Sequence, residues 1–587
     1  MKLPSPKLPV PQLQIYPMDF ILIITNFPWA SFHLYNRRRQ PSTRRLYYSL
    51  LPCLFTSSIQ PSFKKPIRAF VSNDRLSMAY LLPALAASAL IAVWVYGKPK
   101  KQPPLPPGPP ADPIIGHMRL IPQNDQEMFF YELGKQYGDV VYLHVLGRPM
   151  IVLNSVKAAV DLLEKRSSNY SDRPDFPIFE LMGWDPTVTF LHYGKQFSTQ
   201  RKLLQEYLNK NECLKYHRFQ TQEARVLVQN LLSNPEGRDG ALARFGTAIV
   251  IRLVSGHQIT SDDDPYIRMA EDVGYTAANS GPPGGTAVDF FPFLQYFPSW
   301  FPGTYYARFA RSCRPVVREL HDFPYNAVKE QLAKGTARPS FLTSQIEALN
   351  NNPEGKNVNK LEDILGAAGA MYIGGADTTA SSMSIFCLAM VLHPECQLKA
   401  QEEIDRVIGN GRLPELTDRD SLPYMECLMQ ETLRWNHAAP TGVPHRSLED
   451  DIYNDMFIPK GSVIIANLRG MTLDEDVYSE PLKYNPVRFL PKPEGLGEPF
   501  PVTTFGFGRR VCPGRYLADA SLWIAMATLL ATSTILKVIG DDGKEITPPV
   551  VFISGIASHP APFKCNIKPR SPTAQALLDQ MDTSDTY

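Results

Sequence analysis

The strongest constraint on the fold is the segment Phe505–Gly514, which places Cys512 in a glycine-rich loop directly before the apolar, helix-like stretch Ala518–Leu530. Backbone N–H groups at the beginning of a helix stabilise a nearby thiolate, so this position predicts a deprotonated cysteine that acts as a ligand. Arg510, two residues earlier, is placed to pair with a carboxylate of a bound cofactor. The alternative is a buried structural cysteine in a turn. Three glycines allow the backbone to approach a flat cofactor closely: Gly506, Gly508 and Gly514.

The chain of 587 residues carries a formal net charge of +2, which predicts neither a nucleic-acid partner nor an acidic substrate. Its eight cysteines are scattered, with no C-x-x-C pair and no histidine at zinc-finger spacing. This pattern argues against structural zinc and against a disulfide scaffold. A reduced catalytic domain that faces the cytosol is the simplest interpretation.

The segment Met78–Tyr96 contains no charged residue. At about 1.5 Å per residue it reaches about 28 Å, which is just enough to cross the hydrocarbon core of a membrane. Trp94 and Tyr96 stand where aromatic residues meet the membrane surface. We therefore expect one transmembrane anchor over residues 78–97, with a buried core helix as the alternative. The basic, proline-rich stretch 98–110 follows and is expected to act as a stiff hinge.

Residues 1–77 carry eleven Lys or Arg but only Asp19 and Asp74 as acidic residues. This positive charge before the anchor would hold the N-terminal side in the cytoplasm and send the following domain into the lumen. The apolar run Phe20–Trp29 is too short to span a membrane. Our hypothesis is that Met78 is the true start and that residues 1–77 are a gene-model artefact. A cleaved organellar presequence is the alternative.

No second linker or repeat interrupts residues 111–570, which predicts one large catalytic domain. Short strands are predicted at Val140–Val145 and Ser462–Ala466. The fold class is mainly helical with small β-sheets, and residues 571–587 are expected to form a polar, frayed tail. Hydrophobic periodicity predicts helices at Met128–Tyr137, Ser155–Lys165, Thr221–Leu232, Leu361–His393 and Leu422–Trp435.

Two charged residues, Glu431 and Arg434, lie at positions i and i+3 of a predicted helix, which places them on one helix face. A second arginine, Arg488, follows in the segment Tyr484–Phe489. By itself a helical E-x-x-R pair usually marks a solvated face. The order of these residues before Cys512 makes a shared role worth testing.

The predicted helix Leu361–His393 is interrupted by Gly374 and Gly375, followed by the acid–alcohol pair Asp377 and Thr378. A glycine inside a helix costs about 1 kcal/mol relative to alanine, and sequences tend to break such local rules at functional sites. The alternative is that Thr378 bonds to a carbonyl of its own helix and that Asp377 is a salt-bridged surface acid.

The pattern F-x-x-G-x-R-x-C-x-G over Phe505–Gly514 resembles the haem-ligand loop of the cytochrome P450 family, and the other motifs are similar to that family in order and spacing. The resemblance implies the cytochrome P450 fold and a haem (iron protoporphyrin IX) with Cys512 as its axial thiolate ligand. Within the loop, it implies cofactor-binding roles for Phe505, Gly508, Arg510 and Gly514.

The resemblance also implies residues outside the loop that hold the haem carboxylates. Arg201 stands at the arginine of a W-x-x-x-R pair, although Phe197 replaces the usual tryptophan. His445 occupies a position where the family often has a propionate-binding histidine or arginine. A histidine satisfied inside the core is the alternative interpretation for His445.

The same resemblance implies roles for two further sets of residues. Glu431, Arg434 and Arg488 would form a buried triad that supports the thiolate loop, and losing one partner of such a cluster costs about 3–5 kcal/mol. Thr378, with Asp377 as its partner, would deliver protons to dioxygen. These expectations concern residues that local sequence rules alone do not explain.

The implied activity is a haem-thiolate monooxygenase that inserts one atom of O2 into a hydrophobic small molecule. The chain has no dinucleotide-binding motif, so electrons from NADPH would come through a separate reductase, with cytochrome b5 as a second candidate donor. Local segments are similar to the O-methylsterigmatocystin oxidoreductase-like group of fungal secondary metabolism. The expected location is the endoplasmic reticulum membrane, single-pass, with the domain facing the cytoplasm. Alternatives are a haem-thiolate isomerase or dehydratase, and a non-enzymatic haem-binding membrane protein.

Overall fold

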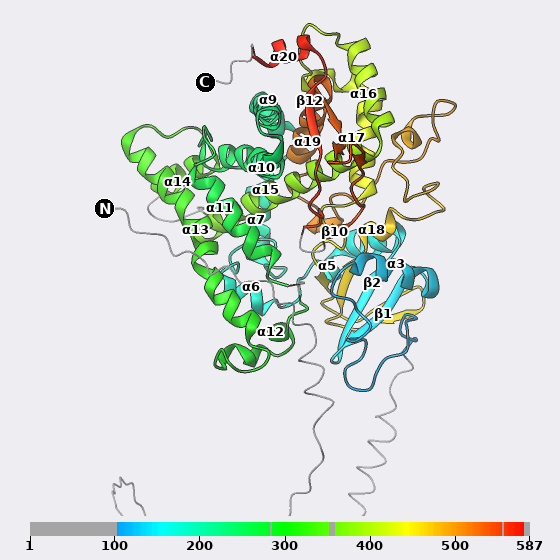
Figure 1. Cartoon of the computed structure of the whole chain (residues 1–587). Coiled ribbons are helices and arrows are strands. Elements are labelled where there is room, and N and C mark those ends of the chain that lie inside the picture. Colours follow the sequence, from blue (N-terminus) through cyan, green and yellow to red (C-terminus); the bar gives the residue numbers. More distant parts are fainter. Residues whose placement is uncertain (1–101, 282–283, 352–358, 554–556, 580–587) are drawn as a thin grey trace, which may run out of the picture. The chain divides into compact units, whose positions relative to one another are not determined.

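The computed structural model describes residues 102–281, 284–351, 359–553 and 557–579. The expected N-terminal extension and the expected anchor at Met78–Tyr96 lie outside the described residues. Residues Pro103–Tyr587 form one compact unit. This unit is mainly helical with small sheets, as the sequence predicts (Figure 1).

Long helices make up most of this unit, and shorter ones connect them. The helices of eight or more residues are α3 (Gln126–Tyr137), α7 (Lys195–Leu208), α9 (His217–Ser233), α10 (Arg238–Ser255), α11 (Pro265–Ala278), α13 (Tyr305–Lys334), α14 (Phe341–Asn350), α15 (Leu361–Leu392), α16 (Pro394–Val407), α17 (Pro423–Trp435), α19 (Arg515–Thr532) and α20 (Pro572–Asp579). The shorter ones are α4 (Val156–Ala159), α5 (Ser167–Tyr170), α6 (Pro177–Met182), α8 (Lys210–Cys213), α12 (Ala287–Phe290) and α18 (Leu468–Met471).

Single turns of other helix types complete the helical part. The segment η1 (Val160–Lys165) is a π-helical turn that continues α4 directly. The 3-10 turns are η2 (Leu214–Tyr216), η3 (Pro235–Gly237), η4 (Pro292–Tyr296), η5 (Leu416–Ser421), η6 (Pro486–Phe489) and η7 (Gly508–Arg510).

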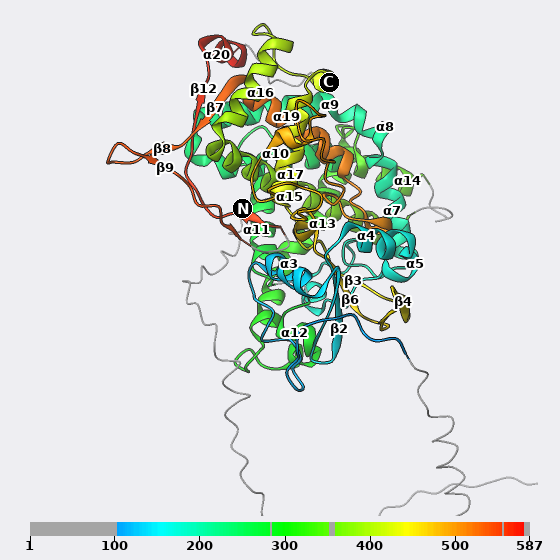
Figure 2. The same cartoon turned by 90° about the vertical axis from the view of Figure 1, so that its right-hand side faces the viewer.

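The largest sheet has four strands in the order β1-β2-β6-β3: β1 (Val140–Val145), β2 (Arg148–Leu153), β6 (Val463–Ala466) and β3 (His445–Arg446). Strand β2 is antiparallel to β1 but parallel to β6, so distant parts of the sequence meet in this sheet. The other pairs are β4 (Asp451–Tyr453) with β5 (Met456–Ile458), β7 (Ser533–Leu536) with β12 (Asn566–Pro569), β8 (Val538–Ile539) with β9 (Glu545–Ile546), and β10 (Phe552–Ile553) with β11 (His559–Pro560). The β8–β9 hairpin projects away from the helices (Figure 2).

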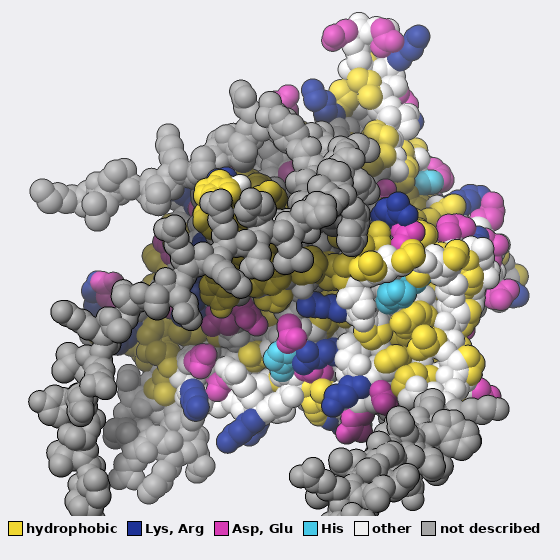
Figure 3. Space-filling view, turned by 90° about the horizontal axis from the view of Figure 1, so that it is seen from below, with side chains coloured by type: hydrophobic (Ala, Val, Ile, Leu, Met, Phe, Trp, Pro, Cys, Tyr) yellow, Lys and Arg dark blue, Asp and Glu magenta, His cyan; other side chains and the backbone are white. Residues whose placement is uncertain are grey.

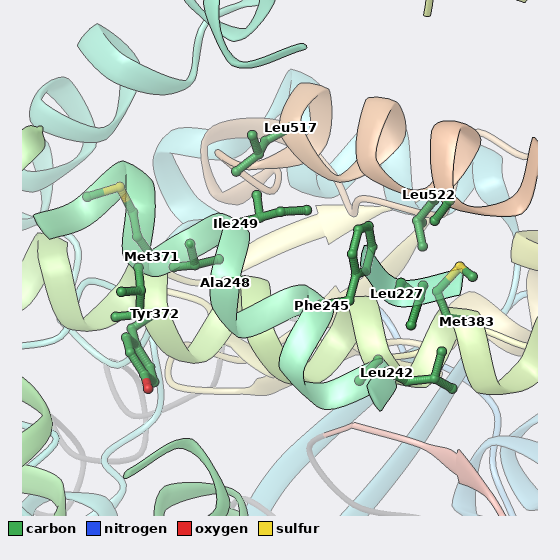
Figure 4. Packing of buried hydrophobic residues seen from close by; sticks show 14 of the residues in the cluster. Leu227, Leu242, Phe245, Ala248, Ile249, Met371, Tyr372, Met383, Leu517 and Leu522 are labelled. Carbon is green, nitrogen blue, oxygen red and sulfur yellow. The ribbon is translucent and has the colours of Figure 1, made fainter. Parts of the chain in front are cut away.

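Helix α15 lies in the middle of the helical part, where it packs along α10 and also contacts α7 and α19. Its long apolar sequence suits this position, since most of its residues are buried. Among the described residues it is the one helix long and apolar enough to span a membrane, and its burial identifies it as a core helix. Figure 4 shows the side chains between α9, α10, α15 and α19: Leu227, Leu242, Phe245, Ala248, Ile249, Met371, Tyr372, Met383, Leu517 and Leu522.

The sequence located several elements closely and misjudged two. Helix α15 ends at Leu392, where the periodicity predicts an end at His393, and β1 coincides with its predicted range. The predicted helix Ser155–Lys165 is instead the short α4 followed by the π-turn η1. The expected frayed tail contains helix α20, because Ala574 and Leu578 are buried against the unit.

The described part of the proline-rich hinge is bound to the unit and does not extend freely from it. The backbone N–H of Tyr142 in β1 donates to the carbonyl of Pro107 at 2.9 Å, and Phe457 donates to Pro104 at 2.8 Å. A Cβ at Gly108 would lie 2.1 Å from the carbonyl oxygen of Tyr142, so only glycine permits this approach. The prolines present carbonyl acceptors but no competing backbone donors, which suits a segment lying beside a strand edge.

Candidate functional site

The cysteine loop connects the 3-10 turn η7 to helix α19. Cys512 lies three residues before Arg515, the first residue of α19, and its own backbone N–H donates to the carbonyl of Phe505 at 2.9 Å. Gly506 and Gly508 both adopt the left-handed conformation, with φ of 70° and 61°. The loop therefore closes on itself just before the helix, as the sequence predicts for a ligand-binding turn.

The three loop glycines have different surroundings. A Cβ at Gly508 would lie 1.9 Å from the carbonyl oxygen of Leu163, so this glycine permits contact with the π-turn η1. A Cβ at Gly506 would meet nothing within 4 Å, which leaves open space for a flat group. Gly514 has an ordinary φ of −85°, and its Cβ position is 4.0 Å from the Cys512 sulfur.

Opposing electrostatic effects act on Cys512. Burial raises the pKa of its thiol, while the Gly514 N–H and the positive charges of Arg201 and Arg515 act in the opposite direction. The backbone donor and the positive charge that favour a thiolate are therefore present beside Cys512. A metal cation bound to the sulfur would favour the thiolate further.

Arg510 is half-buried, and its hydrogen bonds are all made to backbone carbonyls. Its Nε donates to Ser171 at 2.9 Å, and its two terminal nitrogens donate to Val188 at 3.0 Å and Leu191 at 2.7 Å. Burial lowers the pKa of Arg510 to about 9. Its guanidinium lies 3.8 Å from the ring centre of Phe197, so the phenyl ring that replaces the expected tryptophan supports the cation through its face.

Two further arginines lie in the same cationic cluster. Arg201 of α7 donates to the carbonyl of Val511, next to Cys512, at 2.9 Å. Arg173 donates to the carbonyls of Thr189, Val443 and Pro444, at 3.0, 2.5 and 2.8 Å. Each of these arginines has a lowered pKa, caused first by burial. Nearby positive charge adds to the effect, from Arg510 on Arg173 and from Arg515 on Arg201.

His445 of β3 completes this region, but as a neutral ring. Its Nδ1 lies 2.7 Å from the carbonyl oxygen of Tyr170, and burial together with Arg173 and Arg510 lowers its pKa well below the usual range. A neutral imidazole that donates from Nδ1 has no second proton to give to a carboxylate. In this state the structure favours the interpretation of a satisfied core histidine. An anionic group beside it would raise its pKa and provide an Nε2–H donor.

The cationic cluster fits a ligand that carries carboxylates. Within the described residues, Arg173, Arg201 and Arg510 form no ion pair, and the neighbouring carboxylate of Asp172 is engaged by Arg446 at 2.6 Å. Asp172 attracts both Arg173 and Arg510, but one carboxylate cannot balance three arginines, so a dianionic cofactor would add the missing negative charge. The donor set, one thiol beside three arginines, matches an iron porphyrin with two propionates.

On α15 the two adjacent glycines do different things. A Cβ at Gly375 would lie 2.3 Å from Cγ2 of Val250, so this glycine allows α10 and α15 to pack closely. A Cβ at Gly374 would meet nothing within 4 Å, and Gly374 is exposed. Only Gly374 therefore opens a groove of the kind that the sequence predicted for both residues.

Thr378 and Asp377 have the contacts that the alternative interpretation expected. The Thr378 hydroxyl donates to the carbonyl of Gly374 at 2.6 Å, and Oδ1 of Asp377 lies 3.0 Å from Nε2 of His559. These contacts do not remove either residue from proton transfer. The Thr378 oxygen keeps lone pairs that can accept a proton, and it stands one turn from the open position at Gly374.

The charged triad forms as predicted. One carboxylate, Glu431, accepts from Arg434 at 2.6 and 2.9 Å and from Arg488 at 3.1 Å, and all three side chains have no exposed surface. The backbone N–H of Asn485 donates a fourth bond, at 2.8 Å. Arg488 also binds Glu498 at 2.6 Å, in the segment that leads into the cysteine loop. The triad is therefore connected to that loop through Glu498.

Sequence reasoning missed Arg173 and His559. Arg173 stands in an irregular segment before α6, where no local pattern distinguishes it from a solvated arginine. His559 follows residues 554–556 in a two-residue strand, and nothing in its sequence neighbourhood points to α15. Both residues reach the site from elements that are distant in sequence, so only the folded chain identifies them.

Comparison with known proteins agrees with this geometry. Residues 106–566 match the family model described as Cytochrome P450. Cytochrome P450 monooxygenase 136 of Postia placenta is 38% identical over 520 residues, covering 88% of this chain and 97% of that protein. A monooxygenase of the same description from Armillaria gallica is 36% identical over 516 residues, covering 87% and 100%. The monooxygenase claR of Ampulloclitocybe clavipes is 38% identical over 478 residues, covering 81% and 88%.

Proposed function

Since this chain belongs to the cytochrome P450 family and is a monooxygenase whose family cofactor is a haem with a cysteine thiolate ligand, we propose that Cys512 is that ligand. One observation carries the assignment. Cys512 lies just before α19, next to a cluster of three arginines that form no ion pair among the described residues. A thiol ligand and a site for two propionates are thus in one place.

Arg510, Arg173 and Arg201 would hold the haem carboxylates, with His445 behind them. Phe505 and Gly514 belong to the loop that presents the thiol, while Gly508 fixes this loop against η1. The haem, when bound, supplies the activation of dioxygen. The chain contributes binding, orientation and protons.

The proposed reaction consumes two electrons and two protons for each oxygen atom inserted, and the oxidation of NADPH supplies both electrons and one of the protons. A substrate RH, O2, NADPH and H⁺ give ROH, H2O and NADP⁺, with the electrons delivered by a separate reductase. Thr378 Oγ1 would pass a proton onward and accept its replacement from the Asp377 carboxyl. Asp377 would be reprotonated from water.

The substrate that we propose is an uncharged, hydrophobic small molecule of fungal secondary or xenobiotic metabolism. A cavity of about 310 Å³ beside α6 has aromatic walls formed by Phe176, Phe179, Phe190 and Trp184. Leu191 also lines this cavity, and its carbonyl accepts a hydrogen bond from Arg510. The aromatic walls favour flat, apolar parts of a ligand near the proposed haem site, while Glu180, Asp185, His192 and Arg314, which also line the cavity, offer it polar contacts.

We further propose that the protein is anchored in the endoplasmic reticulum membrane, with this unit on the cytoplasmic side. The segment that follows α12 exposes large aromatic side chains to solvent. Figure 3 shows hydrophobic side chains on the face of the molecule seen from below. Such residues are suited to the interface of a membrane in which the substrate dissolves. The exposed members are Phe293, Tyr296, Phe297, Trp300 and Tyr305.

The test is product formation in microsomes that contain the full chain and a fungal reductase. We would supply NADPH and a panel of steroids, terpenes and polycyclic aromatics, and measure product masses. A product heavier by one oxygen atom is expected with the wild-type chain and not with Cys512→Ser. Thr378→Ala should retain the thiolate-type carbon monoxide spectrum but release more hydrogen peroxide for each NADPH. Unchanged peroxide release would contradict the role of Thr378.

A further inference from the structure

His559 and Asp377 join the β10–β11 strand pair, called the C-terminal hairpin below, to the middle of α15. The Nε2 of His559 lies 3.0 Å from Oδ1 of Asp377, and about two fifths of each side chain is exposed, 38% and 40%. The contact bridges 182 positions in the sequence. Asp377 is the acidic partner of Thr378 in the proposed proton transfer, so the contact with His559 bears on the proposed function.

Ser558, the residue before His559, is fixed by two hydrogen bonds. Ser558 accepts a hydrogen bond from the hydroxyl of Ser381, and its own backbone N–H donates to the carbonyl of Ala438 at 2.8 Å. Asp377 and Ser381 are four residues apart and share one face of α15. Two successive turns of the helix therefore bind two consecutive residues of the hairpin, and the imidazole position is fixed by more than its own contact.

The contact draws the Asp377 carboxylate to a different side of the helix from Thr378. The Thr378 hydroxyl bonds to Gly374, so these two residues define the open face of α15. Consecutive residues of an α-helix are separated by about 100° around the axis. While Asp377 is bound to His559, its carboxylate is turned toward β11 and away from the Thr378 hydroxyl.

The charges around this pair favour a protonated histidine. Burial lowers the pKa of His559, but the hydrogen bond and charge of Asp377 and the charge of Asp239 outweigh it, so the net direction is upward. Asp239, on α10, is itself paired with Arg238 at 2.8 Å. On the other side of Asp377 is a cavity of about 160 Å³, which Glu271 of α11 also lines. This cavity gives Asp377 access to water.

We propose that His559 is a positioning residue that controls proton delivery: as an imidazolium it holds Asp377 away from Thr378, and as a neutral ring it releases the carboxylate. The inference rests on the proposed proton transfer through Asp377 and Thr378. The proton lost by His559 goes to water. Once released, the Asp377 carboxylate takes a proton from water in the cavity and passes it to Thr378. The fraction of electrons that end in product, and not in hydrogen peroxide, therefore depends on pH.

The first test measures the pair without catalysis. Diethyl pyrocarbonate reacts with a histidine ring only in its neutral form. Mass spectrometry of the full chain gives the modification rate of His559 at each pH, and this rate gives the titration midpoint. We expect a lower midpoint in Asp377→Asn than in the wild type, because the charge that stabilises the imidazolium is removed. His192, which is paired elsewhere, serves as the internal control. Equal midpoints for His559 in the two proteins would overturn the proposal.

The second test compares peroxide release with NADPH consumption between about pH 5 and 8, the range in which histidine titrates. In the wild type, peroxide per NADPH should fall as pH rises through the His559 midpoint. In His559→Gln, which keeps a hydrogen-bond donor but cannot titrate, this pH dependence should disappear. Ser381→Ala is the matched control, because it weakens the same hairpin contact without removing a titrating group, so it should keep the wild-type pH dependence.

The outcomes separate the inference from the proposed function. If Thr378→Ala increases peroxide release but His559→Gln keeps the wild-type pH profile, the proposed function stands and the role of His559 is wrong. If Thr378→Ala changes nothing, the proton pathway and the inference fail together. His559→Ala provides a second variant, and the thiolate-type carbon monoxide spectrum shows which variants remain folded.

Discussion

Replacing Glu431 by glutamine should strongly destabilise the protein. The carboxylate accepts four hydrogen bonds, from Arg434 at 2.6 and 2.9 Å, from Arg488 at 3.1 Å and from the Asn485 backbone at 2.8 Å. Glutamine has one acceptor oxygen and no charge, and its amide would point N–H groups at guanidinium N–H groups. Arg488 would keep Glu498 as a partner, but Arg434 would lose its only ion pair among the described residues.

The magnitude follows from complete burial. The side chains of Glu431, Arg434 and Arg488 have no exposed surface, so water cannot replace the lost partner. Removing one member of a buried pair costs about 3–5 kcal/mol. A loss of about 4 kcal/mol multiplies the unfolding equilibrium constant by about 1,000, and it is a large share of a typical stability of about 5–15 kcal/mol.

The assay is the urea dependence of unfolding, measured by pulse proteolysis on the wild type and on Glu431→Gln. The matched control is Glu475→Gln, which breaks the solvent-exposed pair between Lys135 and Glu475 at 3.2 Å. Exposed pairs contribute little, so the control should unfold with the wild type. If Glu431→Gln unfolded at the same urea concentration as Glu475→Gln, the reasoning about the triad would be refuted.

Three further predictions concern ligand binding and pH. Cys512→Ser should lose the thiolate-type carbon monoxide spectrum while circular dichroism shows unchanged helix content; loss of both signals would instead indicate a role in folding. Arg173→Gln should release haem to a scavenger faster than the wild type, because one buried cation facing the carboxylates is removed; an unchanged rate would exclude Arg173 from the site. Burial lowers the pKa of His437 to about 3 from 6.5. The folded state therefore loses stability as pH falls from 6.5 toward 3, by up to about 1.4 kcal/mol per pH unit, and urea unfolding of His437→Asn should show a smaller loss.

Local sequence patterns were sufficient for elements whose structure depends on nearby residues. The apolar run on α15 and the glycine-rich loop before α19 were identified from sequence, because helix periodicity and backbone conformation are properties of adjacent positions. They were not sufficient for the segment after β2, where a regular helix was predicted but α4 passes into the π-turn η1. In the fold, the carbonyl of Leu163 in η1 meets Gly508, a contact that no local rule contains.

The candidate site divides in the same way. Motif spacing singled out Cys512, Thr378 and the triad of Glu431, Arg434 and Arg488. The structure places the three triad side chains together, as predicted, and all of them are buried. Spacing did not determine the desolvation of the cysteine, because burial depends on the elements packed around it. Nor did it determine the direction of Asp377, which is set by a histidine from the other end of the domain.

By itself, the sequence determined which residue types this protein offers for chemistry and in which order they occur. It also located α3, α9, α15, α17 and α19 to within a few residues, since these helices follow short-range steric and hydrophobic rules. Only the tertiary structure decided which charges lie together, as in the arginine cluster around Arg510, and which acid binds which histidine. Electrostatic interactions act through space, and long-range packing brings together residues that are far apart in the sequence.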